Sequence, residues 1–295
     1  MKAREIRQQS GVLTGAVASL RGRFRDVIVR YLRPQWIRHP LAITPGIYEN
    51  FAPVERLTEL PAGRRLVVIA PHPDDESIGA GGLIALWHAA GRQAEVVFLT
   101  DGAAGNPVLR DHSLSAEERN RIARSTARQR QSEAETALGL LGAKGRWLDG
   151  TDGALWRDAR RISQGLAAQW QLCPPDLLVV PFPADRHPDH AAAARIAATA
   201  ADIAALDPGL PVLCYEVWSP CPATVVLDIS TVAAVKARAI AAHESQVVST
   251  DYLAASRGLA AYRAITAGLA SGAQAEAFHA CTLADLGKLC ARLRV

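Results

Sequence analysis

The sequence predicts an α/β fold, a three-layer Rossmann-like sandwich built on a largely parallel sheet. Three observations lead to this prediction. Short apolar runs alternate with longer helical stretches from Arg64 onwards, as is typical of parallel sheets covered by helices. Two of the apolar runs lead directly into polar loops, and α/β sheets place ligands beyond the carboxyl ends of their strands. The chain has 295 residues, of which 49% are hydrophobic and 21% charged, which is enough for one substantial core.

The first half of the expected sheet comes from three apolar runs. Residues 65–70 predict a buried strand, and a helix follows over 77–90. A strand at 94–100 precedes a polar loop and a long arginine-rich helix over 115–142, and a short strand lies near 146–149. Glutamates interleave with the arginines of the long helix, which indicates a solvated face. No aromatic-rich basic platform accompanies them, so no nucleic-acid partner is expected.

The second half repeats the alternation of helices and strands. A strand at 176–182 delivers the second polar loop, and an alanine-rich helix follows it. The pattern then predicts two more strands and three closing helices. In order, the expected elements are a helix at 158–171, the strand at 176–182, a helix at 190–205, strands near 211–217 and 223–228, and helices at 230–243, 251–263 and 282–292.

Glycines near the first polar loop invite comparison with a dinucleotide-binding fingerprint. In that fingerprint the glycines follow the strand directly and open the helix. Here Gly79-Ala80-Gly81-Gly82 lies inside the first helical turns, beyond the polar residues. The glycines therefore indicate close approach of the helix to the sheet.

Two polar motifs follow strands that lie far apart in the sequence. Pro-His-Pro-Asp-Asp-Glu occupies 71–76, and His-Pro-Asp-His occupies 187–190. Loops at the carboxyl ends of parallel strands share one edge of the sheet, so we expect the two motifs to converge. Neutral imidazole and carboxylate together suit Zn²⁺ or Fe²⁺. The sequence therefore predicts a divalent metal site.

The expected metal ligands are His72, Asp75 and His190. Three protein ligands leave a position open, as catalytic zinc sites require. Asp74 is adjacent to a ligand but has no ligand role of its own. Since a metal-bound water has a pKa of roughly 7, a nearby carboxylate can accept its proton. Asp74 is accordingly the predicted general base.

His187 and Asp189 complete the predicted catalytic set. His187, as an imidazolium, would stabilise an oxyanion and protonate the leaving group. Asp189 would hold that imidazole in one tautomer and raise its pKa, as carboxylates behind catalytic and metal-bound histidines commonly do.

The two motifs resemble the PIG-L/LmbE-like family of zinc-dependent N-acetylglucosaminyl de-N-acetylases. The resemblance runs from about Arg64 to about Phe278. It implies an LmbE-like fold and, residue by residue, the ligand and catalytic roles given above. Asp185 departs from the pattern, since some members carry tyrosine there. Weaker matches are Thr100-Asp101-Gly102, the segment 130–139, Tyr215–Trp218, His243–Gln246 and Ala275–Phe278, the last of which resembles a segment that closes the site in some members.

The resemblance implies hydrolysis of an N-acetyl group from an N-acetylated amino sugar in a glycan, glycolipid or glycoconjugate precursor. The residues alone imply metal-assisted hydrolysis, which also fits a metallophosphoesterase. A catalytically silent sugar-binding or lipid-binding protein with a structural metal is a third interpretation. Asp74 argues against it, because a silent site needs no free carboxylate beside its ligands.

The N-terminal segment differs from the rest of the chain. Residues 1–38 contain nine Lys or Arg and two acidic residues, a net charge of +7 within a chain total of +4. Apolar residues recur at helical spacing over 13–32, and Pro34 ends the pattern. We expect residues 1–62 to be a basic amphipathic helix with a proline-rich linker, and residues 63–295 to be the deacetylase domain. The helix would pack on its own domain, on a second copy in an oligomer, or on an anionic membrane.

Cysteine usage predicts the compartment. The five cysteines are scattered and form no Cys-x-x-Cys pair, as expected of reduced thiols in a cytoplasmic protein. No apolar run approaches the roughly 20 residues that span a bilayer. The expected location is therefore cytoplasmic, with peripheral contact at the inner membrane face as the alternative for the basic helix.

Overall fold

The computed structural model describes residues 54–293. In this part of the chain the strands form one eight-stranded sheet in the order β1-β7-β8-β6-β5-β2-β3-β4. Every neighbouring pair is parallel except the two pairs that β8 makes with β6 and β7. The predicted fold class is therefore confirmed. The strands are β1 (Glu55–Leu57), β2 (Arg65–Ala70), β3 (Gln93–Thr100), β4 (Lys144–Gly150), β5 (Leu177–Pro181), β6 (Pro211–Tyr215), β7 (Val225–Asp228) and β8 (Ala275–Thr282).

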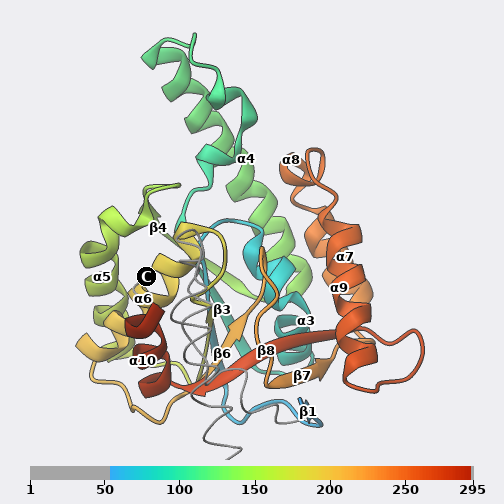
Figure 1. Cartoon of the computed structure of the whole chain (residues 1–295). Helices are drawn as coiled ribbons and strands as arrows, with labels where there is room; N and C mark the ends of the chain where they lie inside the picture. The colour runs from blue at the N-terminus through green and yellow to red at the C-terminus, as the bar shows by residue number, and fades with distance from the viewer. Residues whose placement is uncertain (1–53, 294–295) are drawn as a thin grey trace, which may run out of the picture. The chain divides into compact units, whose positions relative to one another are not determined.

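Helices cover both faces of the sheet (Figure 1). One core lies under α5, α6 and α10 and contains Ile69 and Trp170. The other lies under α3, α4 and α7 and contains Val68 and Trp87. The helices are α3 (Asp75–Ala89), α4 (Ala116–Leu141), α5 (Ala159–Leu172), α6 (Pro188–Ile203), α7 (Ala233–Ala241), α8 (Glu244–Val247), α9 (Tyr252–Thr266) and α10 (Leu283–Leu293), with short 3₁₀ turns at Ala103–Gly105, Pro107–Arg110 and Leu155–Asp158.

The two motif-bearing strands lie side by side in the sheet. β2 pairs with β5, and both are buried over nearly their whole length. Helices on both faces explain why their sequences are continuous apolar runs with no alternation. From β2 the chain moves outward through β3 to β4, and it then returns to the opposite side of β2 as β5. This reversal is the topological switch point at which open α/β sheets bind ligands.

Two strands were not predicted from the sequence. β8 inserts antiparallel between β6 and β7. Its first half, Ala275–Phe278, is the segment expected to close the site, and it lies inside the sheet instead. β1 pairs with β7 within the stretch expected to be linker. The sheet therefore begins before residue 63, and the predicted helix over 13–32 lies outside the described residues.

Helix α3 begins within the first motif and lies close to the sheet. It starts at Asp75, two residues earlier than predicted, so Asp75 and Glu76 occupy its first turn. A β-carbon added at Gly79 would lie 2.1 Å from the ring of Tyr215. The hydroxyl of Tyr215 in turn donates a 2.8 Å hydrogen bond to the carbonyl of Ile69. The glycines thus permit close helix–sheet packing, as the sequence predicted.

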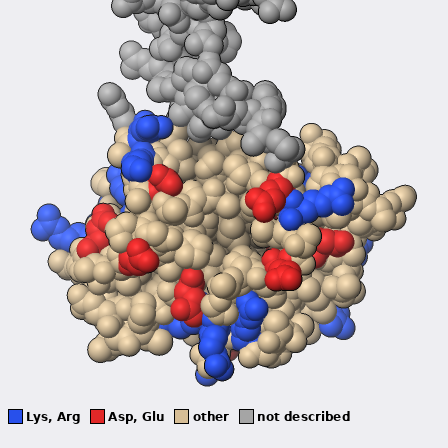
Figure 2. Space-filling model, turned by 90° about the horizontal axis from the view of Figure 1, so that it is seen from below, with Lys and Arg blue, Asp and Glu red and all other residues tan. Residues whose placement is uncertain are grey.

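The surface of the described residues shows two further features. Among residues 54–293, no helix is long and apolar enough to cross a membrane. On the face seen in Figure 2, acidic and basic side chains are interspersed, and neither sign gathers into a single patch. That face therefore lacks the concentrated basic surface that nucleic-acid binding uses.

Candidate metal centre and active-site cleft

The two motifs meet at the carboxyl ends of β2 and β5. The ring centroids of His72 and His187 are 4.7 Å apart, those of His72 and His190 are 5.6 Å apart, and those of His187 and His190 are 5.0 Å apart. His190 is fully buried and His72 is nearly so. Residues more than a hundred positions apart in sequence thus share one small space.

Asp75 lies between the two buried histidines. Its Oδ2 atom is 3.1 Å from Nδ1 of His72 and 3.3 Å from Nε2 of His190. The contact with His190 does not have hydrogen-bond geometry, and neither ring nitrogen of His190 has a hydrogen-bond partner. A buried polar atom without a partner is destabilising. Two nitrogens and a carboxylate oxygen in this arrangement fit a divalent metal.

Carboxylates also stand behind both histidines. Nε2 of His72 is 3.2 Å from Asp189 and 3.2 Å from Asp152. Nδ1 of His190 is 3.5 Å from Asp185. Metal-bound histidines commonly have a carboxylate at the second ring nitrogen, which fixes the tautomer. His72 and His190 therefore each have one nitrogen toward Asp75 and the other toward an outer carboxylate.

Asp152 was not identified from the sequence. It lies in the turn just after β4, the same edge position that made the two motifs conspicuous. One potential metal-binding atom each from Asp152, Asp189 and His72 lies within 4.8 Å of the other two. The same is true of one ring nitrogen each from His72, His187 and His190. A polar residue directly beyond a strand end was the only signal available.

The surrounding carboxylates dominate the electrostatics of the buried imidazoles. Burial lowers the pKa of His190, but Asp75 and Asp185 more than offset it and raise the pKa to about 9. Burial also lowers the pKa of His72, but its hydrogen bonds with Asp152, Asp189 and Asp75 raise the pKa by more. The pKa of His72 is therefore well above its usual range. The carboxylates around the two imidazoles therefore favour positive charge at this site. Protonated histidines provide that charge here, and a bound divalent cation would provide it equally well.

Asp74 adopts an unusual backbone conformation beside these residues. Its φ angle is 139°, in a region that residues other than glycine rarely occupy. The backbone N–H donates to Oε2 of Glu76 at 3.0 Å, and the carboxylate lies 3.1 Å from Nη2 of Arg130. Burial raises the pKa of Asp74 to about 6, Arg130 opposes the rise, and Asp75 adds to it. Asp74 is thus a carboxylate with a pKa close to neutrality.

Arg130 links helix α4 to the first motif. Its guanidinium also donates to the carbonyls of Gly102 and Pro73, at 2.8 and 2.6 Å. The sequence interpretation of the α4 arginines as a solvated face fits the exposed Arg124 and Arg128 but is wrong for Arg130, which is 3% exposed. A buried guanidinium beside Asp74 favours the ionised carboxylate.

His187 caps the N-terminus of α6. Its Nδ1 atom accepts a 3.2 Å hydrogen bond from the backbone N–H of Asp189. Burial, followed by repulsion from His72 and His190, lowers its pKa. Asp189 acts on this pKa in the predicted direction, upward, but burial and the two neighbouring histidines outweigh it, and Asp189 holds the ring through its backbone N–H and not through its carboxylate. The Asp189 carboxylate is turned away and accepts from the amides of Gly153 and Leu155, at 2.7 and 3.0 Å.

A cleft of about 350 Å³ opens over the site. Asp74, Asp75, His72 and His187 line it, whereas the fully buried His190 lies behind them. The cleft is also lined by Arg110 of a 3₁₀ turn, Asp152 after β4, Trp218 after β6, Gln246 of α8 and Tyr252 of α9. A small substrate entering the cleft would meet Asp74 and His187 directly.

Comparison with known proteins decides the family. The family model described as GlcNAc-PI de-N-acetylase, PIG-L, matches residues 67–201. The diacetylchitobiose deacetylase of Thermococcus kodakarensis is 30% identical over 201 residues, which are 62% of this chain and 70% of that protein. The chain belongs to the PIG-L family. The family predicted from the two motifs is thereby confirmed.

Other members and neighbours of the PIG-L family agree. A 1D-myo-inositol 2-acetamido-2-deoxy-alpha-D-glucopyranoside deacetylase from Nocardioides sp. is 30% identical over 171 residues, which are 48% of this chain and 55% of that protein. The chain thus spans about half the length of this group of curated relatives. The solved N,N'-diacetylchitobiose deacetylase of Pyrococcus horikoshii shares the fold, with a TM-score of 0.60, 24% identity and coverage of 77% of this chain and 88% of that one.

Asp185 occupies the position where some PIG-L members have tyrosine. It cannot take over a tyrosine's hydrogen-bond donation when ionised. Its Oδ2 atom accepts from the backbone of Trp218 at 3.0 Å, and its Oδ1 atom accepts from the backbone of His187 at 3.0 Å. Asp185 therefore connects the second motif to the loop that follows β6.

Proposed function

We propose that this protein is a metal-dependent hydrolase that removes the N-acetyl group from an N-acetylated amino sugar, releasing acetate and a free amine. One observation carries the proposal. A donor set of two buried imidazoles and a carboxylate lies beside Asp74 and His187, which line the same cleft. The relatives named above are deacetylases of acetamido sugars, which favours an amide substrate over a phosphoester.

His72, Asp75 and His190 would hold the metal, through Nδ1, Oδ2 and Nε2. Zn²⁺ and Fe²⁺ both suit this donor set. When bound, the metal supplies a Lewis acid that polarises the carbonyl and lowers the pKa of water to roughly 7. Asp189 and Asp185 would orient the two histidines from behind, which replaces the earlier assignment of Asp189 to His187.

Asp74 would act as the base. Water adds to the amide carbonyl as Asp74 takes its proton, and the carbon–nitrogen bond then breaks. The same proton passes from Asp74 to the departing nitrogen, so the products are the amine and acetic acid, which releases its remaining proton to the solvent near neutral pH and leaves as acetate. A pKa near 6 suits both steps, because the group is ionised near neutral pH yet returns its proton readily.

His187 would bind the carbonyl oxygen. Since its Nδ1 atom accepts a hydrogen bond from Asp189, the neutral ring carries its proton on Nε2. That N–H can donate to oxygen as negative charge develops there. The lowered pKa favours the neutral form, so His187 acts as a hydrogen-bond donor in place of the imidazolium first expected.

A single metal is favoured over a pair. A second ion would need Asp152 and Asp189, which lie close enough to His72 to hold one but also accept hydrogen bonds from backbone amides. Asp189 accepts two backbone amides, and Asp152 accepts from the amide of Ala104 at 2.7 Å. Two-metal phosphoesterase chemistry requires free bridging carboxylates, so this arrangement argues against the metallophosphoesterase alternative.

The function is tested by acetate release. Full-length protein loaded with Zn²⁺ or Fe²⁺ is incubated with N-acetylglucosamine linked to inositol, to a nucleoside diphosphate, to a second sugar or to lipid. We expect acetate and primary amine in equal amounts from at least one conjugate. Hydrolysis of a phosphoester panel without any acetate release would overturn the proposal.

The role of Arg130 leads to a prediction about pH. Because Arg130 favours ionised Asp74, Arg130→Gln should raise the pKa of Asp74 further. The base must be ionised to work, so the acid limb of the kcat/KM profile should move to higher pH. The exposed Arg128→Gln on the same helix is the matched control and should leave the limb in place. An unmoved limb in Arg130→Gln would separate Arg130 from the base.

We further propose that residues 1–38 bind to the surface of an anionic membrane, on its cytoplasmic face. The segment's charge of +7 and its apolar spacing support this. Full-length protein should sediment with anionic vesicles at low salt and less at 0.5 M salt, since screening acts over about 8–10 Å at physiological ionic strength. Glutamate at Arg21, Arg23 and Arg25 should weaken sedimentation. Glutamate at Arg121, Arg124 and Arg128, exposed on α4, is the control.

Sedimentation of the full-length protein is the decisive measurement for the membrane proposal. Absence of sedimentation at low salt would end the membrane proposal. Equal weakening by the two sets of substitutions would show that net charge, and not the N-terminal segment, is responsible.

A further inference from the structure

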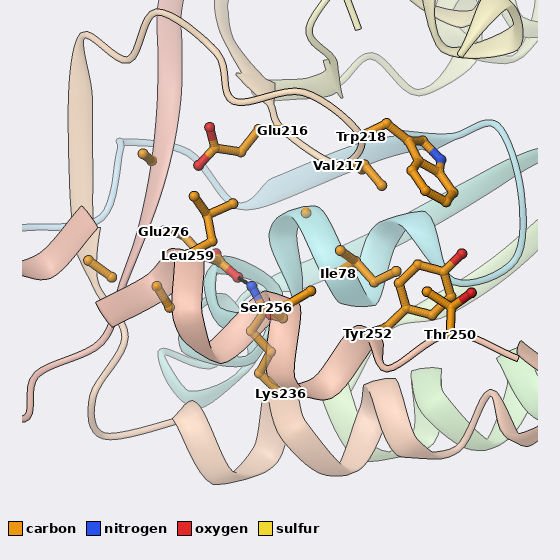
Figure 3. Close-up of a pocket in the computed structure, with 15 residues that line it drawn as sticks. Ile78, Glu216, Val217, Trp218, Lys236, Thr250, Tyr252, Ser256, Leu259 and Glu276 are labelled. Carbon is orange, nitrogen blue, oxygen red and sulfur yellow. Dashed lines mark hydrogen bonds and ion pairs between the residues drawn. The ribbon is translucent and has the colours of Figure 1, made fainter. Parts of the chain in front are cut away.

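A second pocket adjoins the metal cleft. It has a volume of about 190 Å³ and lies between α9, β8 and the loop that follows β6. Ile78, Val217, Trp218, Thr250 and Tyr252 line both cavities, so the two lie directly next to each other. In Figure 3 these shared residues lie at one end of the pocket, and Glu276 with Lys236 lies at the other. A molecule in the metal cleft can therefore extend into this pocket.

The charged groups of the pocket are already paired. Oε1 of Glu276 is 2.7 Å from Nζ of Lys236, and its two oxygens also accept the amides of Gly82 and Leu83, at 2.7 and 2.8 Å. Glu276 and Lys236 are both buried, and so is Glu216, the other carboxylate that lines the pocket. The Glu276 carboxylate is thus fully engaged, and the Lys236 ammonium is held against it as a buried ion pair.

The second carboxylate of the pocket is held in the same way. Oε1 of Glu216 accepts from Nε of Arg263 at 3.0 Å, and Oε2 accepts from the amide of Cys221 at 2.8 Å. The remaining lining consists mainly of aliphatic side chains, with hydroxyls of Thr250, Tyr252 and Ser256. The pocket thus presents apolar surface with no free charge.

Two aromatic rings form the boundary between the cavities. Trp218 and Tyr252 make an edge-to-face contact with their centroids 5.9 Å apart. Trp218 is anchored through its backbone N–H, which donates to Asp185 at 3.0 Å. Asp185 in turn lies behind His190. The boundary of the second pocket is therefore fixed relative to the metal centre.

We propose that this pocket is a subsite for an apolar group attached to the amino sugar whose N-acetyl group is hydrolysed. The proposal rests on the proposed function, whose substrate it narrows to sugars that carry an aryl or alkyl substituent. An apolar cavity of about 150 Å³ accepts benzene, so this pocket has room for a phenyl ring or a chain of about six carbons. A second sugar fits it less well, because most of its hydroxyls would face aliphatic side chains and only a few polar groups, among them the hydroxyls of Thr250, Tyr252 and Ser256, line the pocket.

The test compares glycosides of N-acetylglucosamine in the metal-loaded, full-length enzyme. Methyl, hexyl and phenyl glycosides and diacetylchitobiose are measured by acetate release. Each methylene removed from water contributes about threefold to fourfold in affinity. With two or three of the five additional methylenes of the hexyl group buried in the pocket, the hexyl glycoside should have a KM about 10-fold to 60-fold below that of the methyl glycoside, and the phenyl glycoside should show a decrease of similar size. Their kcat should be similar, because uniform binding lowers KM alone.

A matched pair of variants locates the effect. Ser256→Phe fills the pocket from α9 and should reduce the ratio of the methyl KM to the hexyl KM to near one. Ala254→Phe makes the same kind of change on the exposed side of that helix and should keep the ratio. Equal methyl and hexyl KM values in the wild type, a preference for diacetylchitobiose over the hexyl glycoside, or equal ratios in both variants would overturn the subsite.

Binding measurements separate the subsite from the proposed function. If neither these glycosides nor the conjugates tested above release acetate, the proposed function fails, and the subsite is judged by calorimetric binding of hexyl β-D-glucopyranoside. Binding to the wild type and to Ala254→Phe but not to Ser256→Phe would uphold an apolar subsite. Lack of binding to the wild type would overturn it, whether or not Ser256→Phe folds.

Discussion

Asp74→Asn is expected to lower kcat by roughly 10²–10⁴, the usual contribution of positioned proton transfer. The asparagine has nearly the same shape but cannot accept a proton. Asp74 contacts Arg130 and lines the cleft, and it makes no contact with His72 or His190 that would assign it to the metal. Metal content should therefore stay at the wild-type level while acetate release falls.

The control for Asp74→Asn is Asp202→Asn, an identical change at an exposed position on α6. Its turnover should match the wild type. Full turnover by metal-loaded Asp74→Asn would assign the base elsewhere. Glu76, the nearest carboxylate in sequence after the proposed ligand Asp75, is a poor substitute because it is fully buried and already contacts the Asp74 amide, Ser77 and His243.

His190→Ala is expected to abolish both metal binding and activity. Purified wild-type protein should hold about one equivalent of divalent metal, and removal by a chelator should stop acetate release reversibly. The variant loses the ligand nitrogen that lies 3.3 Å from Asp75. Metal analysis after dialysis, together with turnover, measures both effects.

Graded variants sharpen this test. Asp185→Asn removes the negative charge behind His190 together with one of the two oxygens that accept backbone amides, and it should weaken metal affinity about 10-fold to 100-fold, the usual effect of an outer partner. His112→Ala, at an exposed position, should change neither quantity. Full metal content in His190→Ala would refute the ligand assignment.

The central strands could be predicted because their signal is local. β2 and β5 are covered on both faces and therefore read as unbroken apolar runs that stop at polar loops. β8 gives no such signal. It contains Glu276 and His279, and it joins the sheet between strands that lie some 50 residues and more earlier in the chain. Its place depends on tertiary pairing that no local pattern specifies.

In the site, too, some features could be predicted from local sequence and others depend on distant residues. Residue types and spacing brought His72, Asp75 and His190 to one edge of the sheet. They could not predict which ring Asp189 faces, because that direction is set by the amides of Gly153 and Leu155, more than 30 residues away in the sequence. The helix that starts at Pro188 turns the side chains of successive residues by about 100°, so neighbours in sequence were poor candidates for partners.

The backbone of Asp74 makes one position a point of conflict between activity and stability. A φ of 139° is unfavourable for aspartate, by an amount of the order of 1–3 kcal/mol, and natural for glycine. Burial of its carboxylate destabilises the folded protein further. A chain selected only for thermal resistance would drift toward glycine at position 74 and lose the base. Thermostabilised variants of this protein that remain active should therefore carry their improvements elsewhere in the fold.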